Sequence, residues 1–315
     1  MKTIKDFSWN YDLSVNDFLD RLGSVGFQSV ELKNASDLIV KMKSSNAKIY
    51  LTFTSNMVTS GLRGFFAQLI SLKIPKVIVT TAGTIEEDIM KALGEKFEIG
   101  NFHSDDTALH ERGENRVGNL IIKNESYMKF EDWIVPVLEK LYNRKKRWNV
   151  SELLKEIGFL INDKNSILHQ AAKNNVPIFC PGITDGTFGF HLFMFQDKHP
   201  DFIIDVVRDF KNILLVSNHD EKKAIISLGG SISKHHAILS GLLSGGFQYA
   251  LYMTSSNPSV GSLSGATTQE AKSWGKIKED SDAVTVIGDV TINFPLAMCK
   301  ALDVLKYRGL LEDDS

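Results

Sequence analysis

Short apolar runs rich in β-branched residues recur along the chain, and most of them do not alternate with polar positions. Because strict alternation is typical of a strand with one face in water, an unbroken apolar run indicates a strand covered on both faces. Such coverage is typical of a parallel sheet between helices. The predicted strands are residues 49–54, 76–81, 177–183, 212–217, 224–228, 249–254 and 283–288.

Helical patterns separate several of these runs, at residues 61–72, 85–93, 165–174 and 236–244. This alternation predicts an α/β fold with a doubly wound, mostly parallel sheet and helices on both faces, a Rossmann-like arrangement. Residues 98–129 are polar and less regular, and we expect an excursion at the sheet's edge or over a neighbouring subunit. With no repeat and no Pro- or Gly-rich linker, we predict a single domain over residues 1–315.

The charges of the chain nearly cancel. The 315 residues include 36 Lys and Arg against 38 Asp and Glu, a net charge of −2. This balance gives no attraction to polyanions, so we expect no nucleic-acid partner. The densest basic stretch, from Arg144 to Arg147, ends an amphipathic run that begins near residue 135, where cations favour a helix C-terminus.

The cysteines and the absence of targeting patterns bear on the compartment. Cys180 and Cys299 both stand in apolar sequence, so we expect small buried side chains rather than a disulfide. The chain shows no signal-like opening segment and no apolar run approaching the roughly 18 residues of a membrane span. We therefore expect a cytoplasmic protein with no membrane partner.

Small polar residues and glycines follow the predicted strands. In an open α/β sheet, ligands bind beyond the carboxyl ends of the strands. Glycines and hydroxyl residues there let backbone amides approach a phosphate, and carboxylates such as Asp185 and Asp289 can hold ribose hydroxyls. Each segment alone is also explained by ordinary turn and cap chemistry, and no G-x-G-x-x-G follows a predicted strand. A nucleotide site and plain turns both stay open at this point.

Two C-terminal segments carry a more specific signal, LGGSISKHH at 228–236 and SGATTQEAKSWGKI at 264–277. They resemble the deoxyhypusine synthase family. The likeness continues upstream in TSNMVTSG at 54–61, TTAGTIEED at 80–88, NRVGNLIIKNESYMKFEDW at 115–133 and PGITDGTFG at 181–189. It therefore extends over most of the chain, in the family's order.

This resemblance implies a homotetrameric, NAD-dependent transferase. Such an enzyme oxidises spermidine, holds its aminobutyl group on an enzyme lysine as an imine, and passes it to one lysine of the hypusine-containing translation factor. The implied NAD contacts are Ser55, Asn56, Met57, Val58, Thr59, Thr81, Ala82, Gly83, Glu87, Asp185, Gly230, Ser255, Ser256, Asp289 and Val290. The implied polyamine contacts are Glu86, His235, Glu270 and Trp274.

Lys276, in the segment SWGK, matches the family's reacting lysine. A lysine amine is the residue type that forms imines with carbonyl-like substrates. Glu270 and Trp274 are four residues apart, so on a helix ending near Gly275 they share one face, with Lys276 just beyond. A carboxylate and a π face suit an alkylammonium substrate. The alternative for this trio is a surface pair beside a core tryptophan.

His235 and His236 follow Lys234 in a glycine-led segment that should start a helix. A histidine can move protons near neutral pH, and the resemblance implies that His235 acts at the polyamine. Adjacent residues on a helix point in different directions, so we expect no two-histidine metal site, and His236 could simply pack inside. Lys276 and His235 are therefore the candidate catalytic residues.

Three positions depart from the family's amine pocket. Phe190 and Leu263 stand where aspartates are expected, and Leu239 stands where an asparagine is expected. An amine that loses a polar partner in this way binds less well, so the donor can differ while the NAD positions and Lys276 persist. Two alternatives stay open: a polyamine synthase of homospermidine type with a small-amine acceptor or altered donor, and a catalytically weak regulatory paralogue. The chain also begins near the first match, so we expect no N-terminal extension of the eukaryotic kind.

Overall fold

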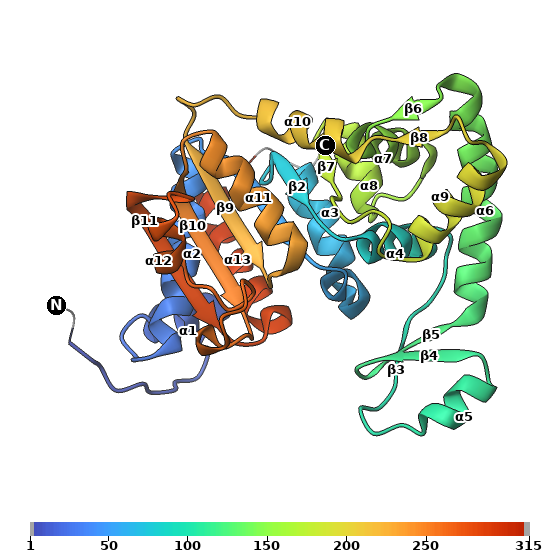
Figure 1. Cartoon of the computed structure of the whole chain (residues 1–315). Helices are drawn as coiled ribbons and strands as arrows, with labels where there is room; N and C mark the ends of the chain where they lie inside the picture. Colours follow the sequence, from blue (N-terminus) through green and yellow to red (C-terminus); the bar gives the residue numbers. More distant parts are fainter. Residues whose placement is uncertain (1–2, 312–315) are drawn as a thin grey trace. The chain divides into compact units, whose positions relative to one another are not determined.

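The computed structural model describes residues 3–311, and their contacts group into two compact units (Figure 1). Unit 1 takes in the chain up to Phe53, residues 72–79 and the chain from Asn212 onward. Unit 2 takes in residues 54–71 and 80–211. The prediction of a single domain over residues 1–315 stays open, because compact groups of contacts need not be independent domains.

Unit 1 is built on a parallel sheet whose strands are neighbours in the order β11-β10-β9-β1-β2. All residues of β9 and nearly all of β1 are buried, as expected for strands covered on both faces. The bounds are β1 Lys48–Phe53, β2 Val77–Val79, β9 Lys223–Leu228, β10 Phe247–Thr254 and β11 Ile277–Ile287. These strands lie within or overlap five of the predicted runs.

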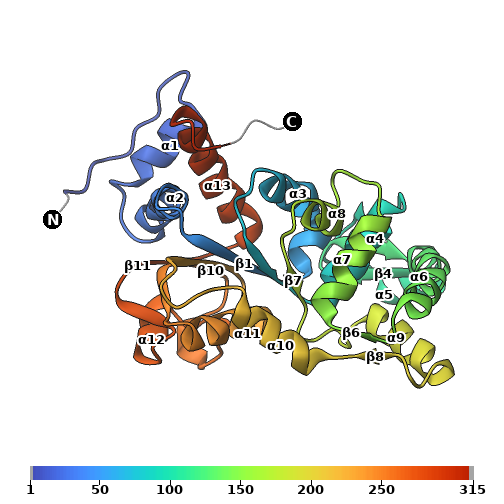
Figure 2. The ribbon, with the colours of Figure 1, turned by 90° about the horizontal axis from the view of Figure 1, so that it is seen from above.

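Helices cover both faces of this sheet, as Figure 2 shows. One face carries α2 Gln28–Ser44 and α13 Val290–Tyr307, and the other carries α11 Ser231–Leu243 and α12 Thr268–Ser273. α1 Val15–Leu22 packs on α2 and α13, and a short 3-10 turn, η2, spans Pro258–Val260. The predicted α/β class with a mostly parallel sheet and helices on both faces is confirmed.

Unit 2 is mainly helical. α4 packs on α6 and α9, and α8 packs on α3 and α7. The predicted excursion contains a small antiparallel sheet in the order β3-β5-β4, beside α5 (Figure 1). The helices are α3 Arg63–Ser71, α4 Ala82–Ala92, α5 Asp106–Glu111, α6 Asn124–Arg144, α7 Val150–Leu160, α8 Ile167–Lys173 and α9 Thr187–Lys198, with a π-helical turn, η1, at Val58–Leu62. The strands are β3 Glu98–Ile99, β4 Glu114–Val117, β5 Leu120–Lys123, β6 Arg147–Trp148, β7 Ile178–Phe179 and β8 Ile203–Ile204.

Two sequence predictions are wrong in detail. The predicted strand at 212–217 falls largely in α10 Val206–Leu215, because Val206, Phe210 and Ile213 continue its apolar run at helical spacing. Cys299 is exposed on α13, whereas Cys180 is buried as expected, and both thiols are free. α6 ends at Arg144, so the basic stretch does begin at a helix C-terminus. No helix within residues 3–311 has the length and apolar character that crossing a membrane requires.

Candidate functional site

The predicted site residues fall into two groups, one in each unit. In unit 1, the segments that follow β9, β10 and β11 lie side by side at one edge of the sheet. The backbone N–H of Gly229 donates to Met253 O at 2.7 Å, and that of Gly288 donates to Thr254 O at 2.9 Å. These bonds bring together five candidates, namely Gly230, Ser255, Ser256, Asp289 and Val290.

Some residues of this first group have structural roles that explain their residue type without a ligand. Asp289 is the N-cap of α13, and its Oδ1 accepts from Thr291 N at 2.8 Å. Its other carboxylate oxygen accepts no bond within the described chain. Val290 is 6% exposed, so only its main chain can reach a ligand. A Cβ at Gly230 would lie 2.3 Å from Ser264 Cα, which explains why glycine is needed there.

In unit 2, the second group forms where the segment after β1 meets the start of α4. The backbone N–H of Ser55 donates to Thr81 Oγ1 at 3.1 Å. A Cβ at Gly83 would lie 2.8 Å from Ser55 Cβ, so the two segments touch because residue 83 is glycine. The Thr59 hydroxyl lies 2.6 and 2.8 Å from the two carboxylate oxygens of Glu87. Residues 55–59, 81–83 and Glu87 therefore belong to one cluster.

The N-terminus of α4 is suited to an anion. Its N-cap, Thr81, makes no side-chain capping bond, and the backbone N–H groups of Ala82 and Gly83 have no acceptor within residues 3–311. Unpaired amides at a helix N-terminus attract phosphate groups. Met57 and Val58 are buried, so these two residues can contribute only main-chain atoms, whereas Asn56 is exposed. These donors fit the pyrophosphate of a dinucleotide.

Two buried carboxylates lie next to this helix start. Glu86 accepts a bond from Phe188 N at 2.9 Å, and burial raises its pKa, with the charge of exposed Asp185 adding to the effect. Burial also raises the pKa of Glu87 to about 7, against the opposing influence of Thr59 and Lys91. Unit 2 thus has one exposed carboxylate, Asp185, and two buried ones, Glu86 and Glu87, whose pKa values burial raises.

In unit 1, the main-chain N–H and carbonyl groups of Lys276 are both hydrogen-bonded. Its N–H donates to Ala271 O at 3.1 Å, and its carbonyl accepts from Phe247 N at 3.0 Å. α12 ends at Ser273 and Gly275 adopts a positive φ, which places Lys276 just beyond the helix as predicted. The half-buried amine lies 5.0 Å from the centroid of the Trp274 ring, which is 65% exposed. Glu270 lies in the first turn of the same helix and is exposed.

Lys234 is a buried lysine on α11 to which the sequence analysis assigned no role. Its side chain is 1% exposed, and burial lowers its pKa to about 8, with Glu270 raising the pKa and Lys276 lowering it further. The charges of Glu270 and Lys276 therefore lie close enough to act on Lys234. The exposed His235 follows on α11, and burial lowers the pKa of half-buried His236 to about 4.

The chain that carries these two groups is similar to known proteins over most of its length. The sequence profile described as deoxyhypusine synthase matches residues 17–301. The chain belongs to the deoxyhypusine synthase family. A Thermoplasma acidophilum protein assigned as a deoxyhypusine synthase is 37% identical over 96% of this chain and 97% of its own length. The deoxyhypusine synthase of Senecio vernalis is 35% identical over 94% of this chain and 88% of its own.

A solved structure extends the family comparison to the fold. The crystal structure of an Entamoeba histolytica protein assigned as a deoxyhypusine synthase matches with a TM-score of 0.68 and 27% identity. The match covers 96% of this chain and 97% of that one. The family resemblance predicted from the sequence motifs is confirmed, and with it membership of a family of transferases.

The departures from the deoxyhypusine synthase pattern lie within the two groups. Phe190 is 56% exposed on α9, two residues after the Phe188 amide that binds Glu86. Leu239 is half-buried on α11, one turn after His235, and Leu263 is the half-buried residue whose carbonyl accepts from Lys234. Phe190 and Leu239 therefore lie close in sequence to residues that contact or form the predicted substrate site, and Leu263 contacts Lys234 through its carbonyl.

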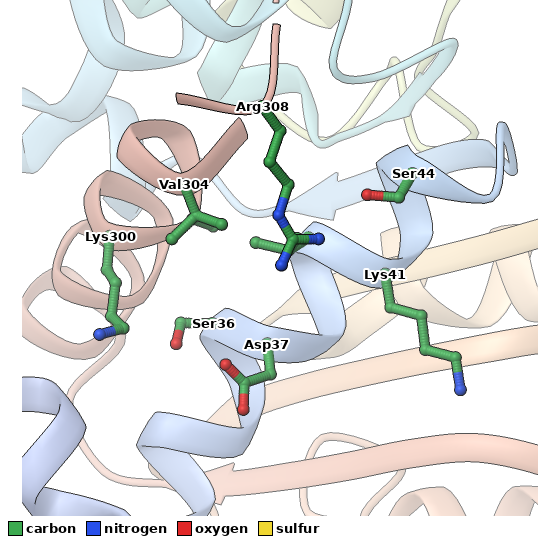
Figure 3. Close-up of a pocket in the computed structure, with 9 residues that line it drawn as sticks. Ser36, Asp37, Lys41, Ser44, Lys300, Val304 and Arg308 are labelled. Carbon is green, nitrogen blue, oxygen red and sulfur yellow. The ribbon is translucent and has the colours of Figure 1, made fainter. Parts of the chain in front are cut away.

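A hollow of about 270 Å³ elsewhere in unit 1 is not part of this site. It lies between α2 and α13, and none of the predicted site residues lines it (Figure 3). Most of its charged side chains already have partners: Lys41 pairs with Asp282 at 2.6 Å and Lys300 with Asp20 at 2.6 Å. Within residues 3–311 there is also no group of three His, Cys, Asp or Glu that could hold a metal ion.

Proposed function

We propose that this member of the deoxyhypusine synthase family is an NAD-dependent transferase. It takes an aminobutyl group from a spermidine-like polyamine onto Lys276 as an imine, and passes it to a lysine of the hypusine-containing translation factor. The observation that carries the proposal is the setting of Lys276: fixed main chain, half-buried amine, an exposed indole 5.0 Å away and Glu270 on the preceding helix. These groups suit an alkylammonium chain next to a nucleophilic amine.

The chemistry balances without another reactant. When bound, NAD would supply the chemistry of accepting a hydride from the carbon beside the donor's secondary amine and of returning it at the end. The Lys276 amine would add to the resulting imine carbon, and the remaining diamine would leave with the proton. The acceptor lysine would then displace Lys276 by the same exchange, and the new C=N bond would be reduced to a C–N bond. One C–N bond is broken, one is formed, and the cofactor ends in its starting state.

The residues of both groups have roles suited to this cofactor. Amides of Ala82 and Gly83 would hold phosphate oxygens, and the carboxylates of Glu87, Asp185 and Asp289 would accept ribose hydroxyls. His235, exposed on α11, would move a proton at the polyamine, and Glu86 would pair with an amine. The fit rests on glycine at position 83 and on the uncapped start of α4.

Borohydride trapping tests the proposal. Protein mixed with NAD and labelled polyamine is reduced, digested and mapped by mass spectrometry. We expect label on Lys276, none in Lys276→Arg, and normal label in the control Lys272→Arg, since arginine keeps the charge but forms no imine. An adduct on Lys234 would mean that the nucleophile is misplaced. No adduct in the parent protein with any polyamine would favour the regulatory paralogue.

A second candidate follows from Phe190, Leu239 and Leu263. Apolar groups where the family pattern has polar ones favour a related polyamine synthase of homospermidine type, with a small-amine acceptor or an altered donor. Supplying either a translation-factor substrate or a diamine to the trapped intermediate separates the two. We also propose a homotetramer, which light scattering after gel filtration would test; a monomeric mass would contradict it.

A further inference from the structure

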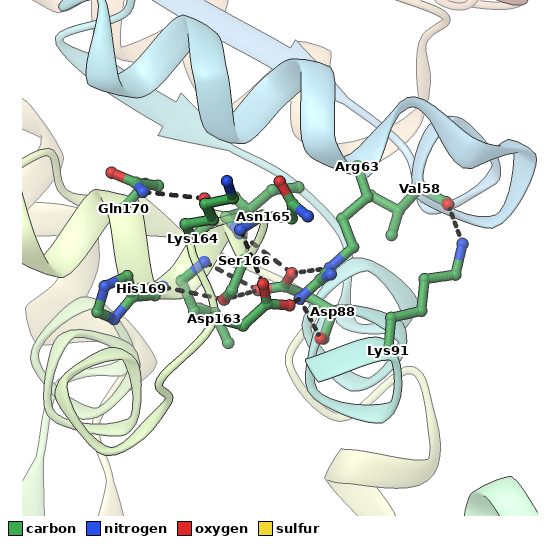
Figure 4. A network of polar contacts seen from close by, with 12 residues as sticks. Val58, Arg63, Asp88, Lys91, Asp163, Lys164, Asn165, Ser166, His169 and Gln170 are labelled. Atoms are coloured by element: carbon green, nitrogen blue, oxygen red, sulfur yellow. Dashed lines mark hydrogen bonds and ion pairs between the residues drawn. The ribbon is translucent and has the colours of Figure 1, made fainter. Parts of the chain in front are cut away.

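Lys91 lies on α4, one turn after Glu87, and its amine reaches back to the turn η1. Its Nζ donates to Val58 O at 2.6 Å and lies 3.3 Å from Thr59 O (Figure 4). Val58 and Thr59 are the last two residues of the predicted cofactor segment that begins at Ser55. The amine therefore contacts two main-chain carbonyls of this segment.

The turn η1 has an irregular backbone. It is a π-helical turn interrupted by a kink at Gly61, whose φ is 105°. π-helical turns are rare and are frequent at functional sites. At the next residue, Arg63 contacts Asp88 Oδ1 at 2.5 Å and Asp163 Oδ2 at 2.8 Å (Figure 4). Lys91 and Arg63 thus fasten the two ends of the turn to α4.

The arrangement around Lys91 is not that of a solvated surface lysine. The side chain is half-buried, and its amine lies 4.5 Å from the centroid of the Phe97 ring. Burial lowers the pKa of Lys91, and the charge of Glu87 is the main influence that raises it again. A partly buried cation is stable only where polar or charged protein groups replace the water contacts that it has lost.

We infer that Lys91 is a positioning residue of the cofactor site. It holds the Val58–Thr59 main chain against α4, and its positive charge favours the ionised form of the Glu87 carboxylate. Thr59 connects the two effects, because its hydroxyl lies 2.6 Å from Glu87 Oε2 while its carbonyl faces Lys91. The inference rests on the proposed NAD function. It assigns Lys91 no contact with NAD itself.

A pH dependence follows from the charges around Glu87. Glu87 is faced by Thr59 of η1, by Lys91 and Glu86 of its own helix, and by Tyr127 of α6, while Arg63 and Asp88 also act on Lys91. With its pKa at about 7, Glu87 gains charge across the neutral range. An ionised carboxylate is the better acceptor for ribose hydroxyls, so NAD should bind more tightly as the pH rises through this range. Without the charge of Lys91, the midpoint should move to higher pH.

Calorimetry of NAD binding across the neutral pH range tests the inference. We expect Lys91→Met to weaken NAD binding roughly tenfold or more and to raise the midpoint, because a charge-assisted bond is lost. Lys91→Arg should keep most of the affinity. Lys155→Met, an exposed α7 lysine bonded only to Asn175, should match the parent protein.

Lys91→Gln separates the two effects and serves if Lys91→Met does not fold. It keeps a donor for the carbonyls but no charge, so we expect near-parent affinity at high pH and a raised midpoint. Parent-like affinity and midpoint in both Lys91→Met and Lys91→Gln would overturn the inference. Absence of NAD binding in the parent protein would instead overturn the proposed function, so the two failures are distinguishable.

Discussion

The amine of Lys234 lies 4.0 Å from the centroid of the Tyr252 ring, and both side chains are 1% exposed. The same amine donates to the carbonyls of Leu263 and Ala266, each at 2.9 Å. Lys234 therefore links α11 and β10 to the segment that leads into α12 and on to Lys276. A buried cation in this position stabilises the segment that carries Lys276.

Lys234→Met should lower the free energy of unfolding by about 1–3 kcal/mol, because two buried carbonyls lose their donor. The variant should also change the pH dependence. Burial lowers the pKa of Lys234 from 10.5 to about 8, so between these values the unfolded chain binds the extra proton and stability rises with pH. Urea unfolding at several pH values should show this rise in the parent protein and a flatter profile in Lys234→Met. An exposed control, Lys173→Met, should keep the parent slope, and equal slopes in all three would contradict the prediction.

Gly83→Ala should weaken NAD binding with little loss of stability. The added Cβ would lie 2.8 Å from Ser55 Cβ, so the segment after β1 must shift away from the start of α4. Calorimetry on cofactor-stripped protein should show near one NAD per chain for the parent protein and reduced affinity for the variant. Gly64→Ala is the control, since its Cβ meets only Asn165 at 3.8 Å. Equal affinity in both variants would remove this contact from the cofactor site.

The parts of the fold that the sequence predicted correctly share one property. Their hydrophobic pattern, together with its flanking residues, fits only one kind of element. β9 and β10 were predicted because their apolar runs are followed by glycines or hydroxyl residues. The run at 212–217 failed because six apolar-rich residues fit either a strand or the end of a helix. The apolar residues Val206 and Phe210, at helical spacing before Ile213 in α10, favour the helix.

The candidate site shows a similar division. Lys276 was predicted from its motif, and its place past α12 follows from the spacing of Glu270, Trp274 and Gly275. Lys91 was missed, although its position four residues after Glu87 on a predicted helix was a usable signal. Its reach to the Val58 carbonyl could not be predicted, because a π-helical turn has no clear sequence signature.

Glu87→Gln should remove a decline of stability with rising pH. The pKa of Glu87 is raised from 4.5 to about 7 in the folded protein, so between these values the folded state binds the extra proton. Stability therefore falls as the pH rises through this window, by about 3 kcal/mol or less. Thermal unfolding from mildly acidic to neutral pH should show the decline in the parent protein and in the exposed control Glu125→Gln. A decline that persists unchanged in Glu87→Gln would assign it to another group.

The identity of the donor depends on three apolar side chains. If Phe190, Leu239 and Leu263 line the amine pocket, spermidine should be a poorer donor than an amine with a less cationic or bulkier far end. Each lost polar partner penalises a charged amine by about 1.5–3 kcal/mol, while an apolar wall favours a hydrocarbon or flat group. Two missing carboxylates together amount to roughly a hundredfold or more in specificity. NADH formation across diamines, spermidine, homospermidine and agmatine would rank the donors.

Restoring the polar groups should reverse that ranking. Phe190→Asp and Leu263→Asp each restore a carboxylate that the family pattern has in the amine pocket, so each should raise the kcat/KM for spermidine relative to the parent's best donor. Phe193→Asp is the matched control, since Phe193 is 59% exposed on the same helix as Phe190 but is not a departure from the family pattern identified above. A gain in Phe193→Asp equal to that in Phe190→Asp would show only a general effect of negative charge. Should the parent protein already prefer spermidine by a wide margin, the three side chains lie outside the pocket, and the donor is that of the family's standard reaction.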